Sequence, residues 1–260
     1  MTLIAILMGT LAAGLGSVLL AAVLAKALLT RFTQHLLSLA AGALLATSFM
    51  HLLPEAFESD VSPHRLFMTL LIGVVFFFLL DKAELWHHGH EHHHGPHGHG
   101  GHHHHPHPDE KVTGSWSVLL GDSVHAFGDG VLVAAAFMAD LSLGVAASVA
   151  VLAHEVPHHM GDLVVLRQGG NHGRGALLKL LMAGGVTVVG GLVGYTVLEQ
   201  HLGILPYWLT VASSSYVYVA LADLIPQLQK RLSAQATLAQ IAWLLTGIAL
   251  VSMVSALTRH

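Results

Sequence analysis

The chain reads His125-Ala-Phe-Gly-Asp129 near its middle and His154-Glu-Val-Pro-His158 soon afterwards, each inside an otherwise apolar segment. The ionisable residues that end each stretch are four positions apart, which places them on one face of a helix. Two such faces brought together would offer a metal ion imidazole nitrogens and carboxylate oxygens. The pattern therefore predicts two neighbouring helices that hold a divalent cation between them.

The cost of burying these groups makes the pattern informative. An ionisable side chain at the centre of a membrane helix costs about 2.5–3.5 kcal/mol on insertion scales, and a bound divalent cation would offset that cost. Pro157 removes one backbone hydrogen bond and clashes with the carbonyl of Ala153, so we expect a kink that exposes a carbonyl near the ligands. The alternative is a set of buried, mutually hydrogen-bonded His and Asp groups that only joins two helices.

The composition indicates an integral membrane protein. Of 260 residues, 53% are hydrophobic and only 10% are charged, whereas soluble domains average about 25% charged residues. The chain has no cysteine, which excludes disulfides and thiolate metal sites. Its formal net charge of −4 comes without a basic patch suited to nucleic acid.

Apolar segments of spanning length, about 20 residues each, predict an all-α protein of eight transmembrane helices that form a single domain over residues 1–260. The first segment lacks the charged start of a signal peptide and is too long for one, so we expect it to be retained as a span. The predicted spans are residues 3–29, 35–56, 63–86, 115–138, 143–168, 175–199, 205–228 and 236–258.

The basic residues predict that both termini lie outside. With that orientation, only Arg65 and Arg259 of the 11 Lys and Arg residues fall outside, in agreement with the positive-inside rule. The residues that then face the cytoplasm are Lys26, Arg31, Lys82, Lys111, Arg167, Arg174, Lys179, Lys230 and Arg231.

The two polar stretches lie at matching depth. His125 is about ten residues into its span and His154 about eleven, so at ~1.5 Å per residue both lie about 15 Å deep, near the middle of a ~30 Å hydrocarbon layer. Ligands at one depth on adjacent antiparallel helices are what a midplane transport site requires. The ligands predicted for it are His125, Asp129, His154, Glu155 and His158.

Further polar residues could mark a pathway on either side of this site. His51 lies near the outer end of the second span, where it is either an entrance residue or a solvated helix end. Asp122, His159 and Asp162 extend the two polar faces toward the cytoplasm. Asp223, near the cytoplasmic end of the seventh span, is either an exit ligand or an interfacial hydrogen-bonding residue.

A histidine-rich tract separates the third and fourth spans. Residues 87–107 contain 13 of the 23 histidines, interrupted by Gly and Pro, so we predict that residues 87–110 form a disordered cytoplasmic loop. Such tracts bind metal weakly at several sites. The tract either catches or senses arriving metal or is a dispensable linker.

The stretches His125-Ala-Phe-Gly-Asp-Gly130 and His154-Glu-Val-Pro-His-His-Met-Gly-Asp162 resemble the fourth- and fifth-helix signatures of the Zrt/Irt-like (ZIP) family of divalent metal transporters, in the branch with HNFxDG and HExPHExGD motifs. The resemblance implies eight spans with outside termini, arranged as three, two and three helices with an inverted repeat. It also implies a two-metal centre with a bridging carboxylate, built on the five ligands named above.

The chain departs from these motifs in ways that bear on the number of metals. Ala126 stands where the fourth-helix motif has Asn, His159 stands where the fifth has Glu, and the sixth span contains no carboxylate before its last residue, Glu199. Each departure removes an oxygen ligand or changes the charge of a second position. We therefore expect one well-formed metal position.

The favoured function is transport of divalent transition-metal ions into the cytoplasm, with Zn²⁺ preferred and Cd²⁺, Fe²⁺, Mn²⁺ and Co²⁺ as alternatives. We expect no enzymatic activity and no required cofactor. The expected partners are the lipid bilayer and metal ions, and a homodimer is a further possibility. The expected location is the inner membrane of a bacterium. Two alternatives stay open: an intramembrane zinc protease, because His154-Glu-Val-Pro-His158 satisfies HExxH, and a membrane-anchored metal buffer or sensor that uses the histidine tract.

Overall fold

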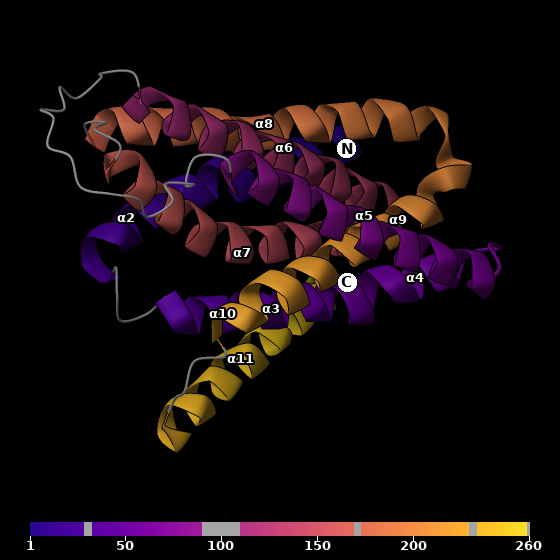
Figure 1. Cartoon of the computed structure of the whole chain (residues 1–260). Coiled ribbons are helices and arrows are strands. Elements are labelled where there is room, and N and C mark those ends of the chain that lie inside the picture. The colour runs from indigo at the N-terminus through magenta and orange to yellow at the C-terminus, as the bar shows by residue number, and fades with distance from the viewer. Residues whose placement is uncertain (29–32, 90–109, 169–172, 229–232, 259–260) are drawn as a thin grey trace, which may run out of the picture.

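The computed structural model describes residues 1–28, 33–89, 110–168, 173–228 and 233–258, and within these ranges every regular element is a helix (Figure 1). Each predicted span is occupied by one helical rod. The rods are α1 (Thr2–Leu11), η1 (Ala12–Gly16) and α2 (Ser17–Leu28); α3 (Thr33–Thr47), η2 (Ser48–Leu52) and α4 (Leu53–Phe57); α5 (Pro63–Gly89); α6 (Glu110–Ala139); α7 (Leu141–Gln168); α8 (Gly173–Gln200); η3 (Leu202–Ile204) with α9 (Leu205–Tyr218), η4 (Val219–Leu224) and α10 (Ile225–Leu228); and α11 (Ala234–Thr258).

The predicted class of all-α membrane protein is confirmed. Among the described residues, seven rods are long and apolar enough to cross a membrane. The eighth, α6, has 30 residues, ample for a span, and carries polar side chains at its centre. The sidedness of the termini and the inverted repeat stay predictions.

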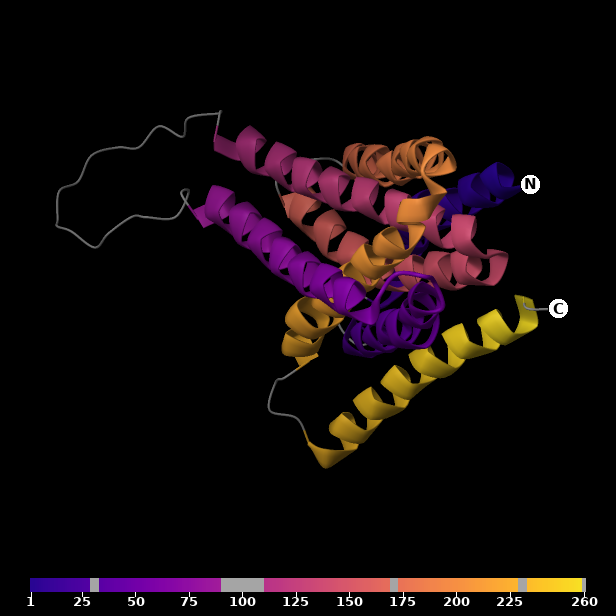
Figure 2. The ribbon, with the colours of Figure 1, turned by 90° about the vertical axis from the view of Figure 1, so that its right-hand side faces the viewer.

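The rods differ in how deeply they lie in the bundle. The rod over Gln34–Phe57 and helix α7 are 72% and 67% buried over their apolar windows, whereas α5 and α11 are 11% buried. Figure 2 shows α11 at the edge of the bundle, where it packs on α3. The interior of the bundle is therefore built around the Gln34–Phe57 rod and α7, the helix that carries the second polar stretch.

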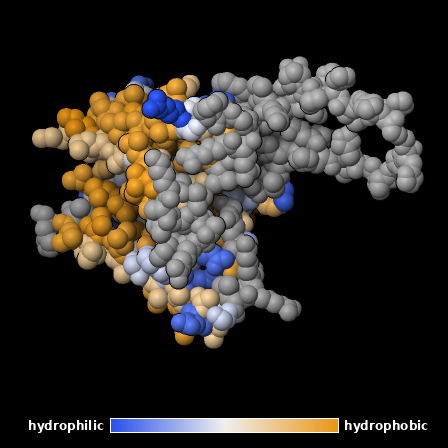
Figure 3. Space-filling model, turned by 90° about the vertical axis from the view of Figure 1, so that its left-hand side faces the viewer, coloured by the Kyte–Doolittle hydropathy of each residue, from blue (hydrophilic) through white to orange (hydrophobic). Residues whose placement is uncertain are grey.

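The outer helices present apolar side chains outward. Phe67, Leu71, Phe76 and Leu79 of α5 are all more than half exposed, and Figure 3 shows apolar residues over much of one face of the described surface. A contiguous apolar surface of this kind is unusual in soluble proteins and is what contact with lipid requires. The exposed pattern thus agrees with the membrane assignment.

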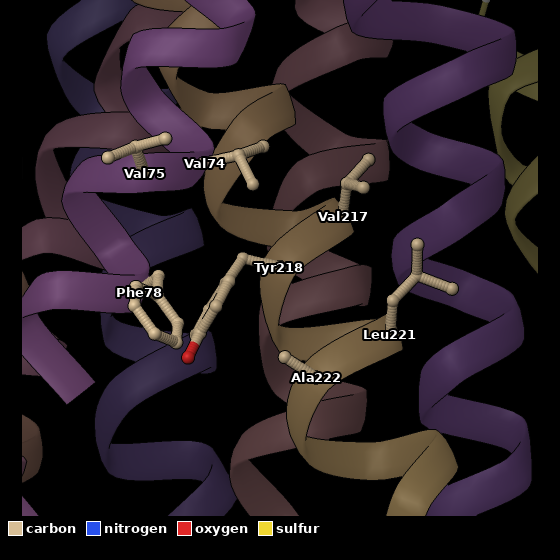
Figure 4. A pocket seen from close by; sticks show the side chains of 7 residues that line it. All are labelled: Val74, Val75, Phe78, Val217, Tyr218, Leu221 and Ala222. Carbon is tan, nitrogen blue, oxygen red and sulfur yellow. The ribbon is translucent and has the colours of Figure 1, made fainter. Parts of the chain in front are cut away.

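An apolar groove of about 350 Å³ lies between α5 on one side and α9 with η4 on the other (Figure 4). Apart from the hydroxyl of Tyr218, its lining is hydrocarbon, so it offers no group that would coordinate a metal ion and is suited to acyl chains. The residues that line it are Val74, Val75, Phe78, Val217, Tyr218, Leu221 and Ala222.

Three of the rods contain a π-helical segment, which the sequence did not predict. These are η1 in the first span, η2 with His51 in the second and η4 with Asp223 in the seventh. π-Helical segments inside α-helices are frequently found at functional sites. One of them, η1, directly precedes Ser17, which contacts the polar core described below.

Helices α6 and α8 approach closely at glycines next to the polar stretch of α6. A Cβ added at Gly130 would lie 2.0 Å from the carbonyl oxygen of Thr187, and one added at Gly190 would lie 2.1 Å from that of Phe127. Small residues permit such backbone contact between membrane helices. The contact fixes the position of α6 along the axis of α8 at the level of Asp129.

We expect Gly130→Ala to destabilise the protein by about 1–3 kcal/mol, because the added methyl meets backbone that cannot move aside. Gly128→Ala is the matched control, since nothing lies within 4 Å of its added Cβ and alanine favours a helix by about 1 kcal/mol over glycine. Thermal unfolding in detergent measures both. Equal melting temperatures for the two variants would contradict the close approach.

Candidate metal centre

Helices α6 and α7 are joined by a turn of one residue, Asp140, which sets their register. The backbone N–H of Ser142 donates to Asp140 Oδ1 at 2.8 Å, and the Ser142 hydroxyl donates to the same oxygen. The side-chain hydrogen bond from Ser142 is the main reason that the pKa of Asp140 lies below its usual value. The carboxylate caps the start of α7 and holds the two helices antiparallel.

This register brings the two polar stretches together at mid-helix. His125 is the sixteenth residue of the 30-residue α6, and His154 is the fourteenth of the 28-residue α7. The predicted matching depth is therefore present along both helices. α7 is helical throughout Leu141–Gln168, with Pro157 inside it.

The first group of ligands contains His125, Asp129, His154 and Glu155, whose ligand atoms all lie within 4.8 Å of one another. His154 Nε2 lies 3.1 Å from Asp129 Oδ2 and 3.2 Å from Glu155 Oε1. His125 Nε2 lies 3.4 Å from both His154 Nε2 and Glu155 Oε1, and 3.9 Å from Asp129 Oδ2. Ligands about 2.0–2.2 Å from a tetrahedral Zn²⁺ are about 3.3–3.6 Å apart. The spacing of this group fits one such ion.

The orientation of His154 is set by a hydrogen bond behind it. Its Nδ1 lies 3.2 Å from the carbonyl oxygen of Ala150, which can only accept, so Nδ1 carries the proton. In the neutral ring, Nε2 then presents a lone pair to the first group. Histidine ligands of metals are commonly held in this way by a carbonyl or carboxylate on the other ring nitrogen.

A second group lies one turn along and contains Asp122, Glu155 and His158. His158 Nδ1 lies 3.2 Å from Asp162 Oδ2 and 3.5 Å from Asp122 Oδ1. The side chain of His158 is 42% exposed, whereas that of Asp122 is 2% exposed. The second group is therefore open to the surroundings on the side of His158.

The structure thus brings together four of the five predicted ligands and places the fifth, His158, in the second group. The reason is the orientation of the His158 ring, whose Nδ1 faces Asp162 on its own helix and Asp122 on α6. Residues four apart on a helix can share one ion, as the placement of His125 and Asp129 in the first group illustrates, so spacing alone does not separate His158 from His154. Glu155 joins the groups, since its Oε1 faces His154 and its Oε2 lies 3.0 Å from His159 Nε2.

The remaining predicted pathway residues fall in different places. His159 is fully buried, and its Nε2 lies 3.8 Å from Asp122 Oδ1. His51 is buried in η2, where its Nδ1 is 3.4 Å from the hydroxyl of Ser255, apart from both groups. Asp223 belongs to η4, but its side chain is outside the described part of the chain.

Most of the predicted histidine loop also lies outside the described residues. Helix α5 reaches Gly89 and α6 begins at Glu110, so the structure describes only the ends of residues 87–110. Residues 90–109 fall in the range that is not described. The predicted role of the tract stays a prediction.

Two neighbours of the site were not predicted as functional. Tyr216 is almost completely buried in α9, a helix that packs against α6. Ser17, at the start of α2, lies 3.1 Å from Nδ1 of His159. The sequence marks Tyr216 only by its place in the polar run Ser213-Ser-Ser-Tyr216, and Ser17 only by the small residues before it.

A buried cluster of histidines and carboxylates at the centre of a helical bundle defines a membrane protein with a metal-binding core. A family model described as ZIP Zinc transporter matches residues 1–112 and 82–255. The chain therefore belongs to the ZIP family, as the resemblance of its motifs predicted.

Several curated proteins are similar to the chain. It is 37% identical to Zinc transporter ZIP10 from Mus musculus over 153 residues, which are 57% of this chain and 18% of that protein. It is 28% identical to Zinc transporter ZIP13 from Pongo abelii over 249 residues, covering 85% of this chain and 66% of that protein. The match to human Zinc transporter ZIP4 is 38% over 115 residues, 44% of this chain and 18% of that protein. The chain thus spans about a fifth of the length of ZIP10 and ZIP4.

Proposed function

We propose that this protein carries divalent transition-metal ions across a membrane, with Zn²⁺ as the preferred substrate, through the first group of ligands. The observation that carries the proposal is the convergence of His125, Asp129, His154 and Glu155 at the middle of two packed helices. Three of these side chains are at most 3% exposed. Membership of a family described by zinc transport supports it.

The ligand chemistry favours Zn²⁺ among the candidates. The group offers two imidazoles and two carboxylates, and no cysteine exists in the chain to favour a softer metal such as Cu(I). Its nearly tetrahedral spacing suits Zn²⁺ better than it suits Mg²⁺, which prefers six oxygens in octahedral geometry. Cd²⁺, Fe²⁺, Mn²⁺ and Co²⁺ remain secondary substrates in this proposal.

The two carboxylates of the first group would hold a dication, and the second group would accept it when it leaves. Asp129 and Glu155 together carry two negative charges, which balance one divalent ion. The second group, with Asp122 and His158, provides the next station one turn away, and Glu155 contacts both. We propose that the ion passes from the first group to the second while Glu155 keeps hold of it, and that Asp162 and Asp223 serve later stages.

The direction of transport rests on the distribution of basic residues. If the nine Lys and Arg residues named above face the cytoplasm, the partly exposed His158 lies on the cytoplasmic side of the first group. Movement from the first group to the second is then movement inward. Inward transport, external termini and a homodimer are parts of this proposal.

The membrane that houses the protein is also a proposal. The relatives named above are animal proteins, and they give no support to the inner membrane of a bacterium. We keep the bacterial membrane only as the expectation raised by the sequence.

The alternative of an intramembrane zinc protease is disfavoured by the geometry. That chemistry needs both histidines of HExxH on one Zn²⁺ and a glutamate free to activate water. In this chain His158 turns to Asp122 and Asp162, and Glu155 lies among the ligands of the first group. Membership of a transporter family points the same way.

Reconstitution in liposomes tests the proposed function. We expect Zn²⁺ to enter vesicles that contain the protein faster than protein-free vesicles, with slower entry of Cd²⁺, Co²⁺, Mn²⁺ and Fe²⁺ and none of Mg²⁺. Metal-sensitive and pH-sensitive dyes inside the vesicles report the flux and any coupled proton movement. Equal rates with and without protein, or equal rates for Mg²⁺ and Zn²⁺, would contradict the proposal.

A further inference from the structure

Ser17 and His159 form a buried contact between the first and fifth spans. Both residues are fully buried, and Ser17 Oγ lies 3.1 Å from His159 Nδ1 although the residues are 142 positions apart in the chain. α2 packs against α7, and Val18, Val156 and Met160 belong to one apolar cluster. A polar contact in such surroundings is held in a fixed geometry.

The hydrogen bonds of Ser17 determine which ring nitrogen of His159 carries a proton. The Ser17 hydroxyl donates to the carbonyl oxygen of Gly14 at 2.7 Å, and a carbonyl can only accept. A hydroxyl has one proton, so toward His159 the Ser17 oxygen acts as the acceptor. Nδ1 of His159 is therefore the protonated nitrogen, and in the neutral ring Nε2 is left with a lone pair.

That lone pair points to carboxylates. His159 Nε2 lies 3.0 Å from Glu155 Oε2 and 3.8 Å from Asp122 Oδ1. A neutral His159 would bring its Nε2 lone pair against these carboxylate oxygens, so a positive charge has to lie between them, either a proton on Nε2 or a metal ion. Ligands of one Zn²⁺ ion are about 3.3 Å apart, so the arrangement fits a shared metal ion.

The same arrangement occurs at His154, where the carbonyl oxygen of Ala150 accepts from Nδ1 and Nε2 faces the first group. At His154 the acceptor comes from the preceding turn of the same helix. At His159 it comes from another span, just after the π-helical segment η1. The π-helical segment thereby links the first span to the polar core.

We propose that Ser17 is a positioning residue that holds His159 with Nε2 presented as a ligand, so that His159 joins Asp122 and Glu155 at the second group. The proposal rests on the proposed function, because it assigns a role within the same transport pathway. In this role Ser17 compensates for a departure from the family motif, in which Glu stands at position 159. An imidazole, unlike a carboxylate, binds metal through a single nitrogen lone pair, so its tautomer has to be set.

The first test is the Ser17→Ala variant. Loss of a group that orients a ligand typically lowers metal affinity 10–100-fold. We therefore expect the KM for Zn²⁺ uptake to rise about tenfold or more while the maximal rate changes by less than about threefold. Ser148→Ala is the matched control, since Ser148 is a buried serine of α7 that bonds a carbonyl four residues earlier and lies six residues before His154. Should Ser17→Ala fail to fold, Ser17→Cys carries the same expectation, because a thiol of similar size is a weak acceptor.

A double-variant cycle with His159→Ala distinguishes positioning from general packing. If Ser17 acts through His159, Ser17→Ala should change KM by less than about twofold in the His159→Ala background, because coupled residues are not additive. Full additivity of the two changes, or an unchanged KM in Ser17→Ala alone, would overturn the proposal.

Equilibrium Zn²⁺ binding separates this proposal from the proposed function. The relevant sites are those of the full chain in detergent that are lost in the His159→Ala variant. We expect Ser17→Ala to weaken binding at these sites about tenfold even if the wild-type protein shows no flux, a result that would refute transport but support the positioning role. Unchanged binding at these sites would refute the positioning role and leave transport to be judged by flux.

Discussion

Zn²⁺ flux through the His154→Ala variant should fall to the level of protein-free liposomes. His154 Nε2 lies within 3.1–3.4 Å of an atom from each of the other three ligands of the first group, so its removal opens the centre of the site. The remaining carboxylates would face each other without the imidazole that completes a tetrahedral set. The initial rate of Zn²⁺ entry into proteoliposomes measures the effect.

Folding of the His154→Ala variant should survive, because the backbone hydrogen bonds of α7 do not depend on the side chain. His64→Ala is the matched control, since His64 is exposed at the start of α5 and its loss should leave flux unchanged. Thermal unfolding in detergent confirms that both variants are folded. Wild-type flux through a folded His154→Ala variant would remove the first group from the pathway.

Glu155→Gln should raise the KM for Zn²⁺ by more than about 100-fold. The substitution keeps the size of the side chain but removes one of the two negative charges in the first group, and it affects the second group as well. The attraction between a dication and one carboxylate at 4 Å is about 8 kcal/mol at an effective dielectric of 20. A loss of about 2.8 kcal/mol is enough for the predicted change.

Glu199→Gln is the control for this substitution, because Glu199 is an exposed residue near the end of α8 that accepts a hydrogen bond from Tyr195. Its KM should match that of the wild type. A Glu155→Gln variant with wild-type KM would show that the ion does not touch Glu155, and the proposed passage between the groups would fail.

The helices were predictable because spanning length and apolar composition leave few choices for a chain in lipid. The expected span at 63–86 became α5 at Pro63–Gly89, and that at 175–199 became α8 at Gly173–Gln200. The ligand faces of α6 and α7 followed from residues spaced by four. Their meeting at mid-helix followed from nearly equal depths in the two predicted spans, about ten residues for His125 and about eleven for His154.

The division of the ligands into two groups was not predictable from spacing. His158 is four residues from both His154 and Asp162, so the sequence places it equally well with either. The contact with Asp122 across the helix pair decides the matter, and that contact depends on the rotation of α6 relative to α7. The contact of Ser17 with His159 joins residues 142 positions apart and depends on a π-helical segment that hydropathy does not reveal.

The division into two groups bears on how many metal ions the protein can hold at once. The departures at Ala126 and His159 led us to expect one well-formed position. The second group shares Glu155 with the first and would give a second ion Asp122 and the imidazoles of His158 and His159. Occupancy of the second group in the metal-loaded protein decides between one resident ion and two.

Anomalous diffraction from crystals of the full chain soaked in Zn²⁺ tests the central claim most directly. We predict a strong peak about 2.0–2.2 Å from His154 Nε2 and from an oxygen of Asp129, at the middle of α6 and α7. The peak should be absent from crystals of the His154→Ala variant that are treated in the same way. Anomalous peaks elsewhere in the wild-type protein with none between these four ligands would contradict the account.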